Sequence, residues 1–281
     1  MTDPEHPETL YAPVGQHRVA YRMSGSGPPE VVITPGLWSH MELIREDPGH
    51  VSFRRRMQSF CRQISFDSLG TGVSDRPVGG SALEHWIESC AAVLDETHST
   101  APVIISLFGS GPLVLEFLSR YPQRCSGLIF INTYGCWARR PGYAAGAPPE
   151  EIARTREFMA NAWGREGYPV PSAPSQAGNA EFLRWSASIQ RAMASPDAVL
   201  NGLTTLENLD LRYVLPQIRV PTLVMARTGL TLGAFARTRY IADHIPDARF
   251  IELPGSDVAP FYETPELILD QVEQFIRSLK Q

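Results

Sequence analysis

Residues 101–134, APVIISLFGSGPLVLEFLSRYPQRCSGLIFINTY, decide the fold of this chain. An apolar run that is too short for a helix, 103–107, leads into a glycine-rich turn at 108–111. A helix-like apolar run, 113–118, and a second strand-like run, 128–131, follow. This order predicts one strand–helix–strand unit of a parallel sheet. In such sheets the turn after a strand usually carries the chemistry.

The same alternation continues on both sides of this unit. The pattern predicts strands at 17–23 (the edge strand of a leading hairpin), 31–34, 64–66, 221–226 and 248–253. It predicts helices at 51–60, with an arginine-rich outer face, and at 83–97, 234–245 and 265–279. We therefore expect an α/β protein with a mostly parallel twisted sheet and helices on both faces. Right-handed crossovers would bring five loops to one edge: 36–40, 67–75, 108–111, 228–231 and 255–258.

The alternation breaks between the strand at 128–131 and the strand at 221–226. This part is rich in Pro, Gly and Ala, and it contains helix-like segments at 152–163, 182–193 and 196–206. We expect an inserted helical cap at 136–212, placed over a core domain formed by 1–135 and 213–281.

Composition limits the classes of function. The net charge of −5 gives no basic field for nucleic acid, and no apolar stretch reaches membrane-spanning length. The N-terminal residues lack the pattern of a signal peptide, which favours the cytoplasm. The four cysteines are not at metal-ligand spacing and the seven histidines do not cluster, so we expect neither a metal nor another cofactor. A small molecule is the expected ligand, and the oligomeric state is not readable.

Several stretches resemble the α/β-hydrolase family over nearly the whole chain. They are ITPGLWSH (33–40), ISFDSLGTGVSDRP (64–77), LDLRYVLPQIRVPTLVMARTG (209–229) and RYIADHIPDARFIELPGSDVAPF (239–261). The chain is most similar to bacterial α/β-hydrolase-like domains that are found beside nucleotide-cyclase domains. The resemblance implies the α/β-hydrolase fold, with a catalytic triad and an oxyanion hole at the loop edge of the sheet.

The resemblance also locates the triad positions in this chain, and all three are apolar. The nucleophile of G-x-S-x-G aligns with Phe108, the acid after the next strand with Leu230, and the histidine with Val258. Phe has no nucleophilic atom, Val accepts no proton and Leu orients no base. Ser110 is the alternative nucleophile if the alignment is displaced by two residues.

The backbone part of the machinery does not depend on these side chains. The resemblance implies an oxyanion hole formed by the amides of Leu37 and Gly109. Asp257 is a candidate acid or base beside the lost histidine, with hydrogen bonding in its loop as the alternative. The residues expected to line the substrate site are Trp38, His40, Phe108, Tyr134, Leu230 and Val258.

Three interpretations of function stay open at this point. The first is a non-hydrolytic enzyme of secondary metabolism that binds a bulky apolar carbonyl compound and promotes C–C bond formation, cyclisation or rearrangement. The second is a catalytically inactive ligand receptor or binding protein. The third is an ordinary esterase that uses Ser110 as its nucleophile.

Overall fold

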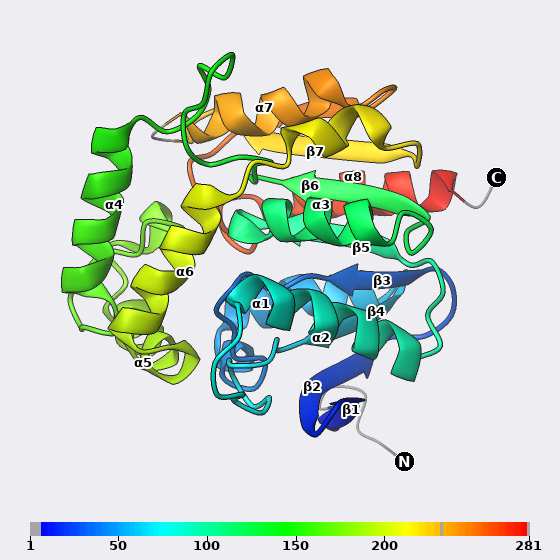
Figure 1. Cartoon of the computed structure of the whole chain (residues 1–281), viewed down its shortest axis with the longest axis horizontal. Coiled ribbons are helices and arrows are strands. Elements are labelled where there is room, and N and C mark those ends of the chain that lie inside the picture. The colour runs from blue at the N-terminus through cyan, green and yellow to red at the C-terminus, as the bar shows by residue number, and fades with distance from the viewer. Residues whose placement is uncertain (1–6, 231–232, 280–281) are drawn as a thin grey trace.

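The computed structural model describes residues 7–230 and 233–279, which form one eight-stranded sheet with helices on both faces (Figure 1). The strand order is β1-β2-β4-β3-β5-β6-β7-β8. The strands are β1 (Leu10–Val14), β2 (His17–Ser24), β3 (Glu30–Ile33), β4 (Arg62–Phe66), β5 (Val103–Leu107), β6 (Gly127–Ile131), β7 (Thr222–Arg227) and β8 (Arg249–Leu253).

The predicted strand–helix–strand unit is present at the centre of this sheet. Strand β5 pairs in parallel with β3 on one side and with β6 on the other. All five residues of β5 are buried because helices cover both faces of the sheet, which explains the continuous apolar run. From β4 to β8 every strand pairing is parallel, as the sequence predicts.

The N-terminal hairpin differs from the prediction in one respect. Strand β2 pairs antiparallel with β1 and also antiparallel with β4, so β1, not β2, is the edge strand. The prediction that 17–23 forms the edge is therefore wrong. Strand β2 is buried at four consecutive residues, 19–22, because it is paired on both sides.

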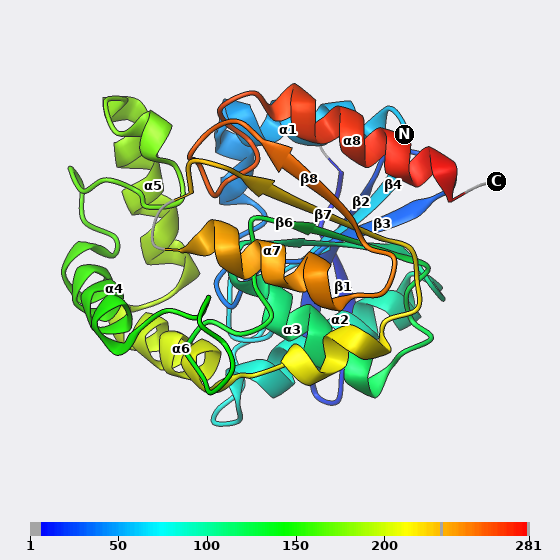
Figure 2. The same cartoon turned by 90° about the horizontal axis from the view of Figure 1, so that it is seen from above.

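Two layers of helices cover the sheet (Figure 2). Helices α1 (Pro48–Gln58) and α8 (Pro265–Ser278) lie on one face, and α2 (Ala82–Glu96), α3 (Gly111–Arg120) and α7 (Ala234–His244) lie on the other. Each face has its own apolar cluster, with Phe53 and Ile268 in one and Trp86, Leu113 and Ile241 in the other.

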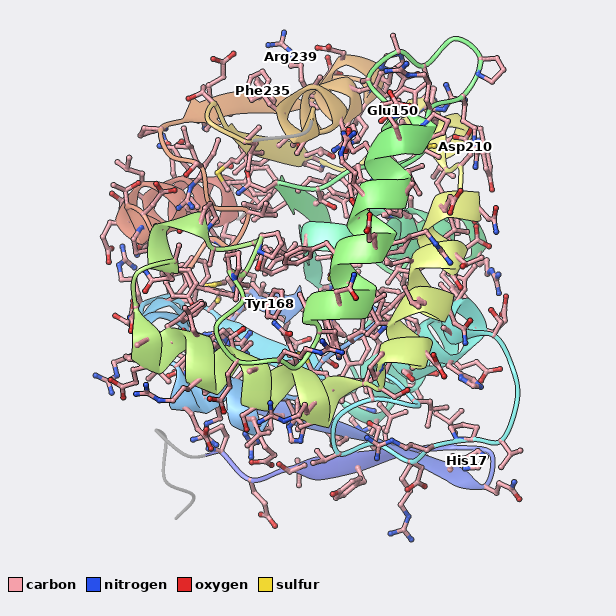
Figure 3. The ribbon with its side chains drawn as sticks, turned by 90° about the vertical axis from the view of Figure 1, so that its left-hand side faces the viewer. His17, Glu150, Tyr168, Asp210, Phe235 and Arg239 are labelled. Carbon is pink, nitrogen blue, oxygen red and sulfur yellow. The ribbon has the colours of Figure 1, made fainter. Side chains whose placement is uncertain are left out.

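A group of three helices between β6 and β7 lies beyond the strand ends (Figures 1 and 3). These are α4 (Pro149–Ala162), α5 (Ala180–Met193) and α6 (Pro196–Asn208). The strand arrowheads point toward this group, and Tyr168 lies on the segment that joins α4 to α5. The helices therefore lie over the carboxyl ends of the parallel strands, while the limits of a cap at 136 and 212 stay a prediction.

The helix group is fastened to the sheet by polar contacts at several points. The buried pair Arg237–Glu151 joins α7 to α4 at 3.0 Å. The indole nitrogen of Trp185 donates to the Leu43 carbonyl at 3.2 Å. In the described ranges, no helix combines the length and the apolar character that crossing a membrane requires.

Candidate functional site

The turn after β5 has the sharp geometry of a catalytic elbow. Phe108 directly follows the strand and holds a φ of 53°, in the left-handed region that is uncommon for a residue with a Cβ. A Cβ added to Gly109 would lie 3.3 Å from the Tyr134 hydroxyl and 3.4 Å from Leu206 of α6, so any larger residue would crowd this turn. The backbone of the elbow is thus present with an aromatic side chain at its tip.

Ser110, the alternative nucleophile, is a structural residue of this turn. It has no exposed surface, and its hydroxyl donates to the Leu107 carbonyl at 2.8 Å and accepts from the Leu107 amide at 2.9 Å. The same oxygen lies 3.0 Å from the hydroxyls of Thr34 and Ser106. A substrate cannot reach this oxygen, so the interpretation that makes Ser110 a nucleophile is wrong.

A cavity of about 970 Å³ lies above the elbow. Five of the predicted residues line it: Leu37, Trp38, His40, Phe108 and Gly109. The helix group supplies the opposite wall, with Met159, Trp163, Trp185, Ile189 and Leu206. The Trp38 and Trp163 rings meet edge to face at 5.8 Å between centroids, which joins the two walls. The volume is in the range of sites for small molecules.

The remaining predicted residues do not border this cavity. Tyr134, Leu230, Val258 and Asp257 are absent from its lining. Tyr134 lies behind the elbow, where burial raises the pKa of its hydroxyl and keeps it protonated. In the predicted loop 228–231, Thr231 lies outside the described residues.

Asp257 makes contacts typical of a structural carboxylate. It is fully buried, and it accepts hydrogen bonds from the Ser175 amide at 2.9 Å and from the Ser175 hydroxyl. It therefore joins the loop after β8 to the segment between α4 and α5. This matches the hydrogen-bonding role that the sequence leaves open as the alternative, and a role in proton transfer finds no contact here.

The loop after β8 is held rigidly by Arg227. This side chain is fully buried, and its guanidinium donates to the carbonyls of Asp257 and Ala259 at 3.0 and 3.1 Å. It also donates to the carbonyls of Tyr262 and Glu263. The start of the loop after β8 is thus held in one position by a buried guanidinium.

The two residues of the predicted oxyanion hole, Leu37 and Gly109, both line the cavity. Within the described residues the Leu37 amide has no hydrogen-bond acceptor. Gly109 lies in the first turn before α3, where helix amides have no partner within the helix. That these amides form an oxyanion hole stays a prediction.

One face of α1 supplies polar residues that the sequence analysis does not identify as functional. His50, Arg54 and Gln58, spaced by four, all line the cavity. Sequence analysis places the arginines of this helix on its outer face, and for Arg54 that prediction is wrong. The four-residue spacing of polar side chains, on a helix packed against the sheet, is the signal that could have indicated an inner polar stripe.

His50 is neutral in this environment. Burial, together with the charges of Arg54 and Arg45, holds the pKa of its imidazole well below the ordinary value. Its ring packs edge to face on Phe261 at 4.8 Å, and Phe108 packs on the same Phe261 ring at 6.3 Å. The Nδ1 atom is buried and has no partner among the described residues. A neutral imidazole beside the elbow can accept a proton.

Two buried thiols, Cys136 and Cys125, do not serve as nucleophiles of this cavity. Burial raises the pKa of the Cys136 thiol to about 11 and that of Cys125 to about 12, so both stay protonated at neutral pH. Neither thiol lines the cavity. In the part of the chain that the structure describes, no group of three or more His, Cys, Asp and Glu side chains is placed to hold a metal ion.

Comparisons with known proteins identify the fold and a class of relatives. No protein-family model matches the chain. Pimeloyl-[acyl-carrier protein] methyl ester esterase of Aromatoleum aromaticum is 27% identical over 217 residues, covering 73% of this chain and 84% of the relative. RutD of Azorhizobium caulinodans, named as a carbamate hydrolase, is 25% identical over 285 residues, 96% and 99% of the two chains.

A solved esterase from Exiguobacterium antarcticum superimposes with a TM-score of 0.76 at 19% identity, covering 97% of this chain and all of that one (100%). The chain therefore has the α/β-hydrolase fold, as predicted. At 19% identity the superposition is evidence for the fold only.

The relatives correct the predicted function. A non-hydrolytic enzyme that forms C–C bonds, cyclises or rearranges a secondary metabolite is the wrong prediction, because the matched relatives are an esterase and a protein named as a carbamate hydrolase. The prediction takes its reaction class from three apolar side chains at the expected triad positions, and the names of the relatives contradict that step. Water is a reactant in hydrolysis, and a base elsewhere in the cavity can activate it.

Proposed function

We propose that this protein is a hydrolase that cleaves an ester of a small apolar acyl compound by direct attack of water, without an acyl-enzyme. The observation that carries the proposal is the cavity itself, whose lining includes Leu37, Gly109 and His50, the last with a neutral imidazole. The esterase and hydrolase names of the relatives support the reaction class. The mostly apolar walls, with Trp38 and Trp163, suit the acyl part of the substrate.

We also propose that Phe108, Leu230 and Val258 occupy the three triad positions. Direct attack of water, without an acyl-enzyme, follows from this part of the proposal. The left-handed φ of 53° at Phe108 supports the first, and the places of Leu230 and Val258 after β7 and β8 support the other two. No side chain then remains at the elbow to form a covalent intermediate. The resemblance to domains found beside nucleotide cyclases stays a prediction.

In the proposed reaction the ester carbonyl oxygen accepts hydrogen bonds from the amides of Leu37 and Gly109. A water oxygen attacks the carbonyl carbon while His50 takes one of its protons. The tetrahedral oxyanion is stabilised by the two amides. Collapse breaks the bond between the acyl carbon and the ester oxygen, and His50 returns the proton to the leaving alkoxide, giving an acid and an alcohol.

The position of His50 is fixed by its neighbours. Asp47 caps α1 by accepting from the His50 amide at 2.7 Å, and it also accepts from the Tyr262 hydroxyl at 2.9 Å. The Phe261 ring supports the imidazole from the side. A base that is held in this way loses little entropy when the reaction begins.

The test measures hydrolysis and covalent labelling together. We expect the protein to hydrolyse p-nitrophenyl esters while a fluorophosphonate probe leaves its intact mass unchanged. His50→Gln should lower kcat by on the order of 10²–10⁴. His244→Gln, at an exposed histidine outside the cavity, is the matched control and should have no effect.

Two outcomes would overturn the proposal. Labelling of a serine or threonine by the probe would show an acyl-enzyme route. Recovery of every ester unchanged, although it binds, would show a binding protein and not a hydrolase.

A further inference from the structure

Part of the cavity lining is polar, and we call the part formed by the four residues named next the polar branch. Arg54 and Gln58 line it from the helix, and Ser24 and Ser65 line it from β2 and β4 at the side of the sheet. The elbow end, in contrast, is bordered by Phe108, Phe261 and the tryptophans. A ligand that fills both parts therefore meets apolar walls at one end and polar groups at the other.

Arg54 is the charged group of this branch that has no neutralising partner. Among the described residues its guanidinium makes no hydrogen bond or ion pair. Other arginines of the molecule are paired: Arg22 with Glu42, Arg56 with Glu273 and Arg237 with Glu151. Burial lowers the pKa of Arg54 to about 10, so it is still a cation at neutral pH.

Two of the acids that line the cavity are already engaged. Asp47 accepts from the His50 amide and from Tyr262, and Glu42 is paired with Arg22. No carboxylate raises the pKa of Arg54 enough to offset its desolvation. Arg54 is half-buried. A cation that is partly withdrawn from water without a counter-ion is stabilised when an anion binds beside it.

We infer that the substrate carries a carboxylate remote from its ester, and that Arg54 binds this carboxylate while the ester carbonyl lies at the elbow. The inference rests on the proposed function for the position of the ester. A carboxylate matches the single charge and the forked donors of one guanidinium. The enzyme would therefore act on monoesters of dicarboxylic acids, with the apolar chain between Trp38 and Phe261.

Binding of uncleavable ligands tests this inference without turnover. The probe is a saturated keto acid with a methyl ketone at one end and a carboxylate at the other, and its comparator is the neutral methyl ketone of the same chain length. We expect calorimetry to give a Kd about tenfold or more lower for the keto acid. Arg54→Met should remove the difference, and Arg54→Lys should keep part of it.

Arg184→Met is the control, because Arg184 is exposed on α5 and lies outside the cavity lining. It should keep the full preference. Equal Kd values for the two ligands in the unmodified protein would overturn the inference, as would a preference that persists in Arg54→Met. A third ligand with a terminal phosphate that bound more tightly than the keto acid would also overturn the assignment of a carboxylate.

The two proposals fail in distinguishable ways. If the keto acid is preferred but no ester is hydrolysed, the carboxylate site stands and the hydrolase does not. If neutral esters are hydrolysed and the keto acid is not preferred, the hydrolase stands and the carboxylate site does not.

Discussion

Phe108 keeps a backbone conformation that its own side chain disfavours. A left-handed residue with a Cβ carries strain of about 1–3 kcal/mol, which persists only where the surroundings enforce it. Here the Thr133 hydroxyl donates to the Phe108 carbonyl, and Ser110 bonds both the amide and the carbonyl of Leu107. The elbow is therefore maintained by its neighbours, so the Gly109 amide keeps its direction whatever side chain is at the tip.

His50 should make the stability of the protein depend on pH. Its folded pKa lies well below the value near 6.5 of an unfolded histidine, so the unfolded chain binds more protons in this range. The stabilisation is complete above about pH 6.5 and is lost as the pH falls from there through the folded pKa. We expect the urea midpoint to decrease from pH 7 to pH 5.

His50→Phe should remove this part of the pH dependence, because no group remains to be protonated. The charged groups around His50 are Arg45, Arg54 and Asp47. Urea unfolding of both proteins at several pH values makes the measurement. If the two slopes are parallel, His50 is not the neutral buried imidazole described above.

At the scale of elements, the strand–turn–helix order is readable from sequence, and the orientation of one helix face is not. The run 103–107 is buried on both sides and therefore apolar throughout, so β5 is predicted without error. Helix α1 is predicted too, but its polar residues were expected to face water. A polar face toward solvent and a polar face toward an internal cavity have the same spacing, which is why His50 and Arg54 escape sequence reasoning.

The same limit applies to the predicted site. Leu37, Phe108 and Gly109 are predicted from the family resemblance, and Trp38 and His40 from their place in the loop after β3; all five line the cavity. Tyr134 and Val258 follow strands as well, yet they do not border the cavity. The direction of a side chain after a strand depends on the local turn, and the topology of the sheet does not determine it.

Replacement of Arg227 or of Arg54 by Met should have opposite effects on the free energy of unfolding. The guanidinium of Arg227 donates to four carbonyls of the loop after β8, so Arg227→Met leaves buried acceptors without donors. We expect a loss of about 3–5 kcal/mol in the free energy of unfolding. Arg54→Met removes a cation without a partner, so stability should stay equal or rise.

Denaturant unfolding of Arg227→Met, Arg54→Met and the unmodified protein measures both changes in the free energy of unfolding. The contrast matters more than either value, because both substitutions replace an arginine by the same side chain. A large destabilisation by Arg54→Met would mean that this guanidinium is paired in the folded protein.

At the scale of the whole molecule, the α4–α6 group and the sheet form the cavity only together. Their contacts lie around its rim: Trp185 with Leu43, Ser172 with Ala259, Ser175 with Asp257 and Glu151 with Arg237. Aromatic contacts of Trp38 and Trp163 and of Phe182 and Tyr262 lie among them. These contacts hold the α4–α6 group in place over the carboxyl ends of the strands.

Asp257 allows a test of how firmly the segment between α4 and α5 is held. In Asp257→Ala the Ser175 amide and hydroxyl lose their acceptor, so the segment between α4 and α5 should open more often. We expect faster amide hydrogen exchange around residues 172–176, with exchange in β5 and β6 unchanged, because the sheet contacts do not involve this carboxylate. Measured by mass spectrometry on peptides, the effect should be local.

The kinetics of Asp257→Asn then separate a structural role from a chemical one. Asparagine keeps an acceptor for Ser175, so KM should change by a small factor and kcat should be kept, since Asp257 does not reach the cavity. A carboxylate that moved a proton in the reaction would lose on the order of 10²–10⁴ in kcat when replaced by an amide. A loss of that size with normal hydrogen exchange at 172–176 would assign Asp257 to the chemistry and would require the cavity to open toward the loop after β8.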